Sequence, residues 1–216
     1  MGINMTKPII LHLCADTGSD SYPYKMAGYD VRLIGSQIGV ENYHPPDNVY
    51  GVFANPVCTY YSKAREANKL KGDETKGHFL VDECLRIIDE CNPDFYVIEN
   101  PATGTLKNYL GKPQFVYEPW HFGSPWTKKT ALWGRFEPPM PIFDDWDEVP
   151  KNDKLYIRPN RKKPGFAFLH KAAIADIDEF APFSVDSDME FRSLCSQKFA
   201  QAFFDVNNCG IFNYTM

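Results

Sequence analysis

The stretch that decides the fold is VYGVFANPVCTYYS, at residues 49–62. Its first six residues form an apolar run typical of a buried strand, and a loop that contains Cys58 follows directly. A second apolar run, at residues 95–98, is followed by Glu99. Because the carboxyl ends of parallel strands meet at one edge of a sheet, we expect the Cys58 thiol and the Glu99 carboxyl to face the same pocket.

Short apolar runs recur along the chain, with helical segments between them. The further strands are expected at residues 9–14, 29–34, 115–117 and 130–133, with a helical turn at 22–27. Apolar residues within 79–88 have the spacing of an amphipathic helix, which Asn92 and Pro93 end. This alternation predicts an α/β fold with a doubly wound, mostly parallel sheet. Ligands would bind where the loop at residues 15–21 meets the Cys58 and Glu99 loops.

Composition narrows the class of protein. With 216 residues, 44% of them hydrophobic, the chain can build one sizeable core. It has no apolar stretch of membrane-spanning length and no secretory signal pattern, so we expect a cytoplasmic protein with no membrane association. Its six cysteines stand singly, which favours reduced thiols, and its histidines lack metal-ligand spacing, so no metal is expected. A net charge of -5 argues against a wholly basic nucleic-acid coat protein but leaves room for a local basic face.

The chain divides into three parts by composition. Residues 1–134 form the expected catalytic core. Residues 135–188 form a proline-rich, acidic connector followed by a basic segment, a reduced recognition region without regular structure. Residues 189–216 supply a C-terminal helix that completes the core, because apolar residues recur at helical spacing over 190–206.

Five segments, in family order, resemble the motifs of the DNA cytosine carbon-5 methyltransferases, particularly compact phage-type members. They are ILHLCADTGS at 10–19, ANPVCTYYS at 54–62, VIENP at 97–101, GSPWTKKTALW at 123–133, and the segment 191–202. The resemblance implies a Rossmann-like class I methyltransferase fold. It also implies S-adenosylmethionine as cofactor and DNA as substrate.

The chemistry of that family gives roles to the matching residues. A thiolate that adds to carbon 6 of a pyrimidine, with a proton or hydrogen bond supplied at ring nitrogen 3, makes carbon 5 nucleophilic. The resemblance makes Cys58 the nucleophile, Glu99 the group at ring nitrogen 3, and Asn100 a support for the loop. The cofactor residues implied are Ala15, Asp16, Thr17, Gly18 and Ser19, with Asp47 near the adenine. The substrate residues implied are Pro56, Tyr60, Lys128, Lys129 and Arg65.

Further substrate contacts are expected from composition. Tyr60, Tyr61 and Trp126 can stack on a base. Two basic segments can meet phosphates. The basic residues of the first segment are Lys63, Arg65, Lys69, Lys71 and Lys76. Those of the second segment are Arg158, Arg161, Lys162 and Lys163.

Three departures from the family pattern stand out. Asp16 occupies the place of the first glycine of the cofactor loop, and Gly35 occupies the place of the acidic residue that ends the second strand and holds the ribose hydroxyls. Only about 50 residues separate Trp133 from Met189, too few for a full target-recognition domain.

Three functions therefore stay open. The first is S-adenosylmethionine-dependent methylation of carbon 5 of cytosine in DNA, in a bacterial host or encoded by a phage. The second is a diverged enzyme that performs other carbon-5 pyrimidine chemistry, on a nucleotide or with a protein partner that supplies recognition. The third is a non-catalytic binding module.

Overall fold

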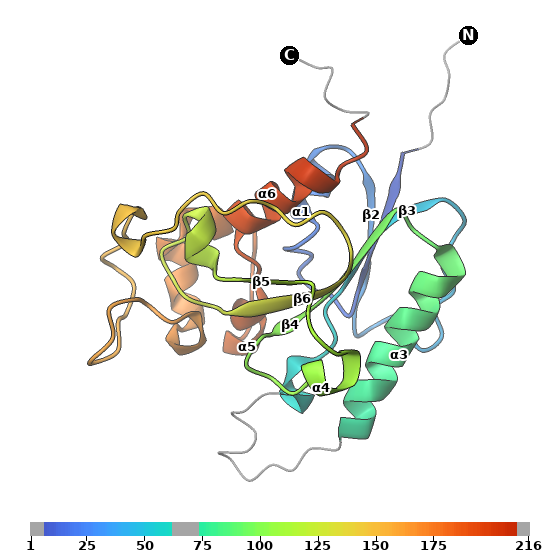
Figure 1. Cartoon of the computed structure of the whole chain (residues 1–216), viewed down its shortest axis with the longest axis horizontal. Helices are drawn as coiled ribbons and strands as arrows, with labels where there is room; N and C mark the ends of the chain where they lie inside the picture. The colour runs from blue at the N-terminus through green and yellow to red at the C-terminus, as the bar shows by residue number, and fades with distance from the viewer. Residues whose placement is uncertain (1–6, 62–73, 211–216) are drawn as a thin grey trace.

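A six-stranded β-sheet forms the centre of the computed structural model, which describes residues 7–61 and 74–210 (Figure 1). The strands are β1 (Ile9–Leu13), β2 (Asp30–Ile34), β3 (Val49–Ala54), β4 (Phe95–Pro101), β5 (Phe115–Tyr117) and β6 (Thr130–Arg135). Their order is β2-β1-β3-β4-β6-β5; β1 to β4 are parallel, and β6 runs antiparallel to both of its neighbours. The predicted α/β class with a mostly parallel sheet is confirmed.

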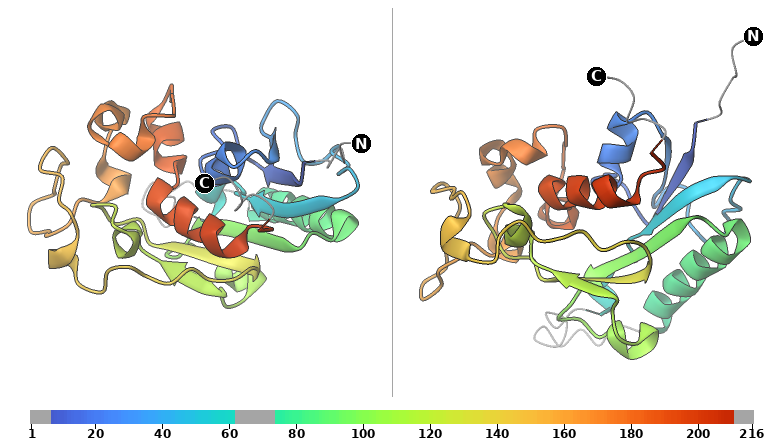
Figure 2. Two further views of the ribbon diagram at one scale, coloured as in Figure 1. Left: turned by 90° about the horizontal axis from the view of Figure 1, so that it is seen from above. Right: turned by 45° about the horizontal axis from the view of Figure 1, so that its top comes forward.

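Helices cover both faces of the sheet, as Figure 2 shows, so the fold is doubly wound. The α-helices are α1 (Tyr22–Met26), α3 (Glu74–Cys91), α4 (Lys107–Leu110), α5 (Asp188–Ser193) and α6 (Gln197–Asn207). The short 3-10 helices are η1 (Cys58–Tyr60), η2 (Pro119–Phe122), η3 (Trp146–Glu148), η4 (Phe166–Phe168), η5 (Lys171–Asp176) and η6 (Asp178–Phe180). Helix α3 packs on one face, and α1 and α6 pack on the other.

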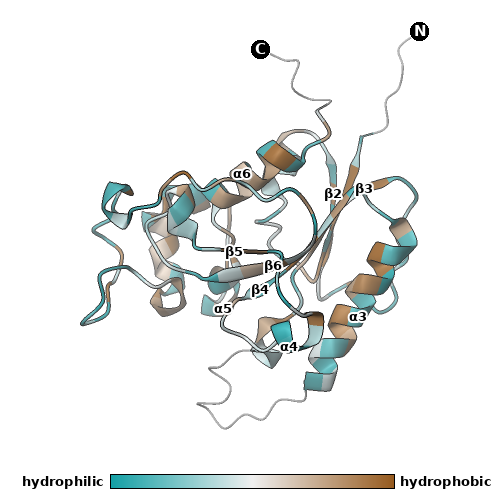
Figure 3. Ribbon diagram, viewed as in Figure 1, coloured by the Kyte–Doolittle hydropathy of each residue, from teal (hydrophilic) through white to brown (hydrophobic). Residues whose placement is uncertain are grey.

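Helix α3 follows the amphipathic pattern of its sequence. Val81, Cys84 and Ile88 are three and four residues apart, which places them on one buried stripe. Figure 3 shows apolar and polar residues alternating around this helix. The predicted end of the helix is confirmed, because α3 stops at Cys91 and Asn92 turns into a left-handed conformation with φ of 39°.

An aromatic cluster fills the opposite face of the sheet. Phe203 of α6 packs with its ring centroid 5.5 Å from that of Phe53 on β3 and 5.8 Å from that of Phe95 on β4. Tyr24 of α1 stacks on Phe95 at 5.6 Å. These tilted and edge-on contacts are the favourable arrangements of aromatic pairs, and they fix α1 and α6 on the strands that lead to the candidate site.

The prediction of one closing helix over 190–206 is wrong, because α5 ends at Ser193 and α6 begins at Gln197. The Ser196 hydroxyl accepts a hydrogen bond from the Phe199 backbone N–H at 3.2 Å and so caps a new helix. The backbone N–H of Cys195 donates to the Ser19 hydroxyl at 3.0 Å. The break lets Leu194 pack against the connector while Phe199 packs against the sheet.

Between the end of β6 at Arg135 and the start of α5 at Asp188, the fully described segment contains 3-10 helices and neither an α-helix nor a strand. It nevertheless contributes to a separate apolar cluster, whose buried members are Trp126, Leu155, Phe166, Leu169, Ile177, Phe180, Phe191 and Leu194. The segment is therefore packed rather than extended in solvent. The division of the chain into three parts at 134 and 188 stays a prediction.

Replacing Phe203 by alanine should lower the free energy of unfolding by about 3–5 kcal/mol, because the ring leaves a cavity between α6 and the sheet. The matched control on the same helix is Val206→Ala, which removes an exposed side chain and should change stability by less than about 0.5 kcal/mol. Denaturant unfolding followed by circular dichroism measures both. Equal losses for the two variants would contradict the assigned packing.

Candidate active site

The loop after β3 is tied to the end of β4 at the carboxyl edge of the sheet. Ala54 pairs with Ile98 at the end of the two parallel strands, so Cys58 and Glu99 leave the same edge. The Asn100 side chain is fully buried, and its Nδ2 donates to the carbonyl oxygen of Pro56 at 2.9 Å. Asn100 thus holds the loop that carries Cys58 against the strand that carries Glu99, the kind of support predicted for it.

Cys58 is the first residue of the short helix η1, and the residue taken as a whole is exposed to solvent. Burial of the thiol among neighbouring protein atoms raises its pKa above the ordinary value of 9.0. The negative charge of Glu99 raises it further, while the charge of Lys128 lowers it. The thiol therefore keeps its proton at neutral pH, unlike the reactive cysteines whose pKa a positive environment depresses.

Glu99 is half-buried and lies near the end of β4. Burial raises the pKa of its carboxyl to about 7. The positive charge of Lys128 and a hydrogen bond from Asn55 lower the pKa, and the charge of Asp20 raises it. At neutral pH a large share of Glu99 is consequently protonated and able to donate a hydrogen bond.

A buried polar chain connects Glu99 to β1. The Nε2 atom of His12 lies 2.8 Å from Oδ1 of Asn55, and its Nδ1 lies 2.9 Å from the hydroxyl of Ser21. Burial lowers the pKa of His12, which favours the neutral ring. Because Nε2 faces the amide oxygen of Asn55, which can only accept, the proton is assigned to Nε2. Asn55 then turns Nδ2 outward and donates to Oδ1 of Asp20 at 3.3 Å and to Oε2 of Glu99 at 3.4 Å. The amide of Asn55 holds two carboxyl groups side by side.

The sequence prediction gave no role to His12, Asp20 or Asn55. Asn55 stands within the nucleophile motif, next to Pro56, which was the available signal. Asp20 and Glu99 also line a cavity of about 10 Å³ against α6, which holds roughly one water molecule and no heterocycle. A ligand of that size would therefore have to approach Glu99 from the open side, where the exposed Cys58 lies.

The loop after β1 also reaches this edge. Ala15, Gly18 and Ser19 are buried, Thr17 is half-buried and Asp16 is exposed. Gly18 has φ of 70°, a conformation that favours glycine. The cofactor residues predicted between 15 and 19 are thus together at the carboxyl ends of β1 and β2.

Asp47 lies elsewhere. It comes directly before β3, whereas the site follows the end of that strand, so the structure places Asp47 at the opposite edge of the sheet. The structure does not bring it to the loop at 15–19.

Of the two lysines predicted to meet the substrate, Lys128 faces the site. Its charge acts on both Glu99 and Cys58, and its Nζ donates to the carbonyl oxygens of Leu194 at 2.9 Å and Ser193 at 3.4 Å. Lys129 is exposed and acts on Glu118 instead. Arg65 lies outside the described residues, as do Lys63, Lys69 and Lys71.

The predicted stacking of Tyr61 and Trp126 on a base is wrong. Tyr61 is 2% exposed in the core beside α3, and Trp126 is 1% exposed between Phe166 and Phe180. Neither ring has a free face. Tyr60, which is half-buried in the same turn as Cys58, is the remaining aromatic candidate.

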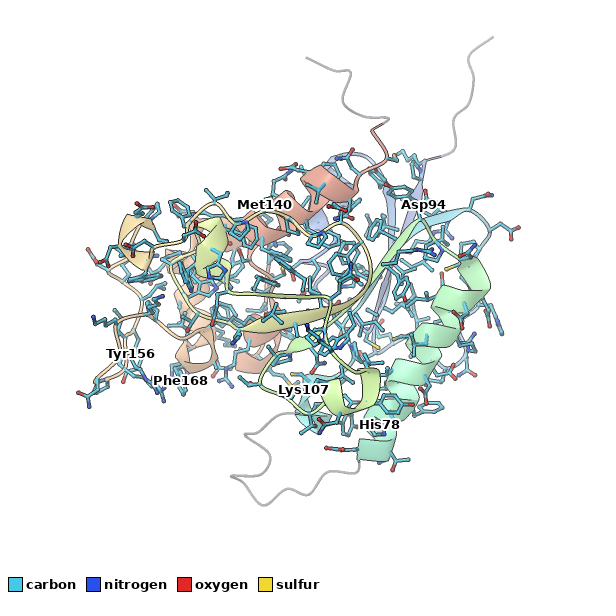
Figure 4. The ribbon with its side chains drawn as sticks, viewed as in Figure 1. His78, Asp94, Lys107, Met140, Tyr156 and Phe168 are labelled. Carbon is cyan, nitrogen blue, oxygen red and sulfur yellow. The ribbon has the colours of Figure 1, made fainter. Side chains whose placement is uncertain are left out.

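A groove of about 450 Å³ with a basic lining lies next to the site. Its lining residues are Thr127, Arg158, Arg161, Lys162, Lys163, Gly165 and Phe168, and we call it the basic groove. The Arg158 guanidinium lies 3.6 Å from the centre of the Phe168 ring, which orients one wall. Figure 4 shows Phe168 on the side of the molecule away from Asp94 and His78. Thr127 links this groove to Lys128, the next residue.

The described part of the chain has neither a helix that could span a membrane nor a cluster of potential metal ligands. Over residues 7–61 and 74–210, no helix combines the length and apolar character needed to cross a membrane. Within those same ranges, no three histidine, cysteine, aspartate or glutamate side chains gather as metal ligands would. The six cysteines, all of them described, are free thiols.

Comparison with known proteins gives a relative in a virus. The chain is 34% identical over 102 residues to a protein of Frog virus 3 (isolate Goorha) named "Probable DNA (cytosine-5)-methyltransferase". Sequence resemblance to the cytosine carbon-5 methyltransferases is confirmed. The match covers 40% of this chain and 46% of the viral protein, so the chain spans about half the length of that relative.

Two further comparisons add less. No family model matches the chain. A prophage-encoded E. coli protein, provisionally described as a DNA modification methyltransferase, is similar in structure with a TM-score of 0.45 and 16% identity. That likeness covers 72% of this chain and 56% of the other, and at this level no argument rests on it.

Glu99→Gln should make the free energy of unfolding depend less on pH between pH 4.5 and pH 8. The native carboxyl binds its proton more tightly than the unfolded one, with a pKa of about 7 against 4.5, so wild-type stability falls as pH rises through that window. The variant lacks this penalty and should gain roughly 1–3 kcal/mol over wild type between pH 4.5 and pH 8. Urea unfolding at several pH values measures it. A difference between the two proteins that is constant with pH would contradict the raised pKa.

Alkylation of Cys58 by iodoacetamide should rise with pH, with its midpoint above 9, because burial and Glu99 disfavour the thiolate. Lys128→Met should move the midpoint to higher pH by removing the charge that stabilises the thiolate. Lys129→Met is the matched control and should leave the midpoint unchanged. Peptide mass spectrometry isolates Cys58 from the other cysteines. A midpoint well below 9 in wild type would refute this electrostatic description.

Proposed function

We propose that this chain transfers a methyl group from S-adenosylmethionine to carbon 5 of cytosine in DNA through a covalent adduct with Cys58. The observation that carries the proposal is the convergence of Cys58, Glu99 and Lys128, whose charges act on one another at the ends of neighbouring strands. The viral relative, which bears the name of this activity, supports the same reaction class.

Each group of the trio has a distinct task in this reaction. The sulfur of Cys58 loses its proton to solvent and forms a bond to carbon 6 of the ring, which pushes electron density toward carbon 5 and ring nitrogen 3. After carbon 5 has taken the methyl group, its proton leaves to solvent and the bond between sulfur and carbon 6 breaks, which restores the aromatic ring and frees the Cys58 thiolate. Glu99, with a pKa of about 7, supplies the proton or hydrogen bond that neutralises the developing charge at ring nitrogen 3. Lys128 lowers the pKa of both groups, so its charge favours the thiolate that must form.

The loop after β1 offers hydrogen-bonding groups that suit an adenosyl cofactor. The bound cofactor supplies an electrophilic methyl group to the nucleophilic carbon 5. The loop at 15–19 offers backbone groups at the carboxyl ends of β1 and β2, where nucleotides bind in such sheets. The space beside Gly35 is occupied by the carboxylate of Asp16, an acceptor suited to hydroxyl groups.

DNA is the proposed substrate because the basic groove adjoins the trio. Its four cationic residues, Arg158, Arg161, Lys162 and Lys163, can contact successive phosphates while the base approaches Cys58. The segment 135–188 is short, so we include in the proposal a preference for single strands, or a protein partner that supplies sequence recognition.

Transfer of labelled methyl groups from S-adenosylmethionine to cytosine-containing oligonucleotides, single-stranded and duplex, tests the proposal. Cys58→Ser should lower the rate by at least about 1000-fold, and Glu99→Gln by roughly 100- to 10,000-fold, because each removes a group that acts on the reacting ring. Cys91→Ser, at the end of α3, is the matched control and should retain wild-type activity.

A 5-fluorocytosine substrate separates the alternatives. Covalent trapping that depends on both Cys58 and S-adenosylmethionine supports methyl transfer. Trapping that occurs without the cofactor favours different carbon-5 chemistry, on a nucleotide or on DNA. Binding of DNA with neither trapping nor methyl transfer would leave the non-catalytic module as the function.

A further inference from the structure

The carboxylate of Asp16 occupies the position where a side chain at residue 35 would stand. Leu13 pairs with Ile34, so the residues after them leave β1 and β2 together. A Cβ atom placed on Gly35 would lie 2.1 Å from Oδ1 of Asp16 and 2.8 Å from the carbonyl oxygen of Ala15. These distances are far below van der Waals contact, so Asp16 takes the space that Gly35 leaves.

Two hydrogen bonds hold this carboxylate in place. Oδ1 of Asp16 accepts from the backbone N–H of Ser36 at 3.0 Å and from the Ser36 hydroxyl at 3.3 Å. Hydrogen bonds to a charged acceptor are stronger than those between neutral groups. Among the described residues, the other oxygen, Oδ2, has no hydrogen-bond partner, and Asp16 is exposed at this edge. One oxygen is therefore tethered and the other is open to a ligand.

We propose that Asp16, on the loop after β1, supplies the carboxylate that accepts hydrogen bonds from the ribose hydroxyls of an adenosyl cofactor. This rests on the proposed function for the identity of the cofactor. In nucleotide-binding sheets of this kind an acidic residue about 20 positions after the first loop commonly performs this task at the end of the second strand. Here Gly35, the first residue after β2, has no side chain, and Asp16 reaches the same place from the loop after the neighbouring strand β1.

The arrangement suits a pair of hydroxyl groups. A carboxylate is an acceptor only, so it can accept from both hydroxyls of a ribose and cannot do so from a deoxyribose to the same extent. The bonds from Ser36 fix the orientation of the group before the ligand arrives, which reduces the entropy lost on binding. Two positions that each depart from the usual pattern thus compensate one another.

Calorimetric titration with S-adenosylhomocysteine and with its 2′-deoxy and 3′-deoxy forms tests the assignment, in wild type and Asp16→Asn. The variant should bind S-adenosylhomocysteine roughly 10- to 100-fold more weakly, since it loses hydrogen bonds to a charged acceptor. The wild-type protein should bind the deoxy forms more weakly than S-adenosylhomocysteine by a similar factor. The variant should discriminate between the hydroxyl and deoxy forms far less, which shows that Asp16 and the hydroxyls act on each other.

Asp47→Asn is the matched control, since it removes the same charge from an exposed residue at the other edge and should leave both affinities unchanged. If Asp16→Asn binds as tightly as wild type and keeps the preference for the hydroxyls, the assignment is overturned while the methyltransferase proposal stands. If wild type binds none of these ligands at millimolar concentration, the methyl donor of the proposed function fails, and the role of Asp16 fails with it. Circular dichroism establishes that the variants fold.

Discussion

The parallel pairing of β3 with β4 is the constraint on which the site depends. The two strands run in the same direction and their last paired residues are Ala54 and Ile98, so the residues that follow each of them come to one edge. The hydrogen bond from Asn100 to the Pro56 carbonyl then ties the loop after β3 to the last residues of β4. A thiol and a carboxyl group that are 41 positions apart in the sequence, at 58 and 99, meet for this reason.

Electrostatics at this edge are balanced between opposing demands. Burial raises the pKa of the Glu99 carboxyl, which keeps a large share of it protonated near neutral pH, and the same surroundings disfavour the Cys58 thiolate. The positive charge of Lys128 lowers the pKa of both groups and so offsets part of the rise caused by burial. The chain of His12 and Asn55 adds a neutral scaffold that fixes the carboxyl without adding net charge.

Much of the fold could be predicted from the sequence because its signals are local. The strands follow apolar runs, and α3 ends where Asn92 and Pro93 end the helical pattern. The placement of Trp126 could not be predicted, because its burial depends on Phe166 and Phe180 from a segment without regular structure. The bond between His12 and Asn55 joins residues 43 positions apart, and nothing local to either one signals it. The break between α5 and α6 likewise depends on Ser19, far along the chain.

The anchoring of Lys128 has a consequence for how such a chain can change in size. Its ammonium group is held by the carbonyl groups at the end of α5, at residues 193 and 194, and both anchors lie outside the segment 135–188. The anchor Leu194 nevertheless packs with Leu155 and Phe166 of that segment in one buried cluster. Extra modules can therefore be spliced into its exposed turns while the cation stays where it is, whereas a deletion that reaches these buried side chains would shift the cation as well.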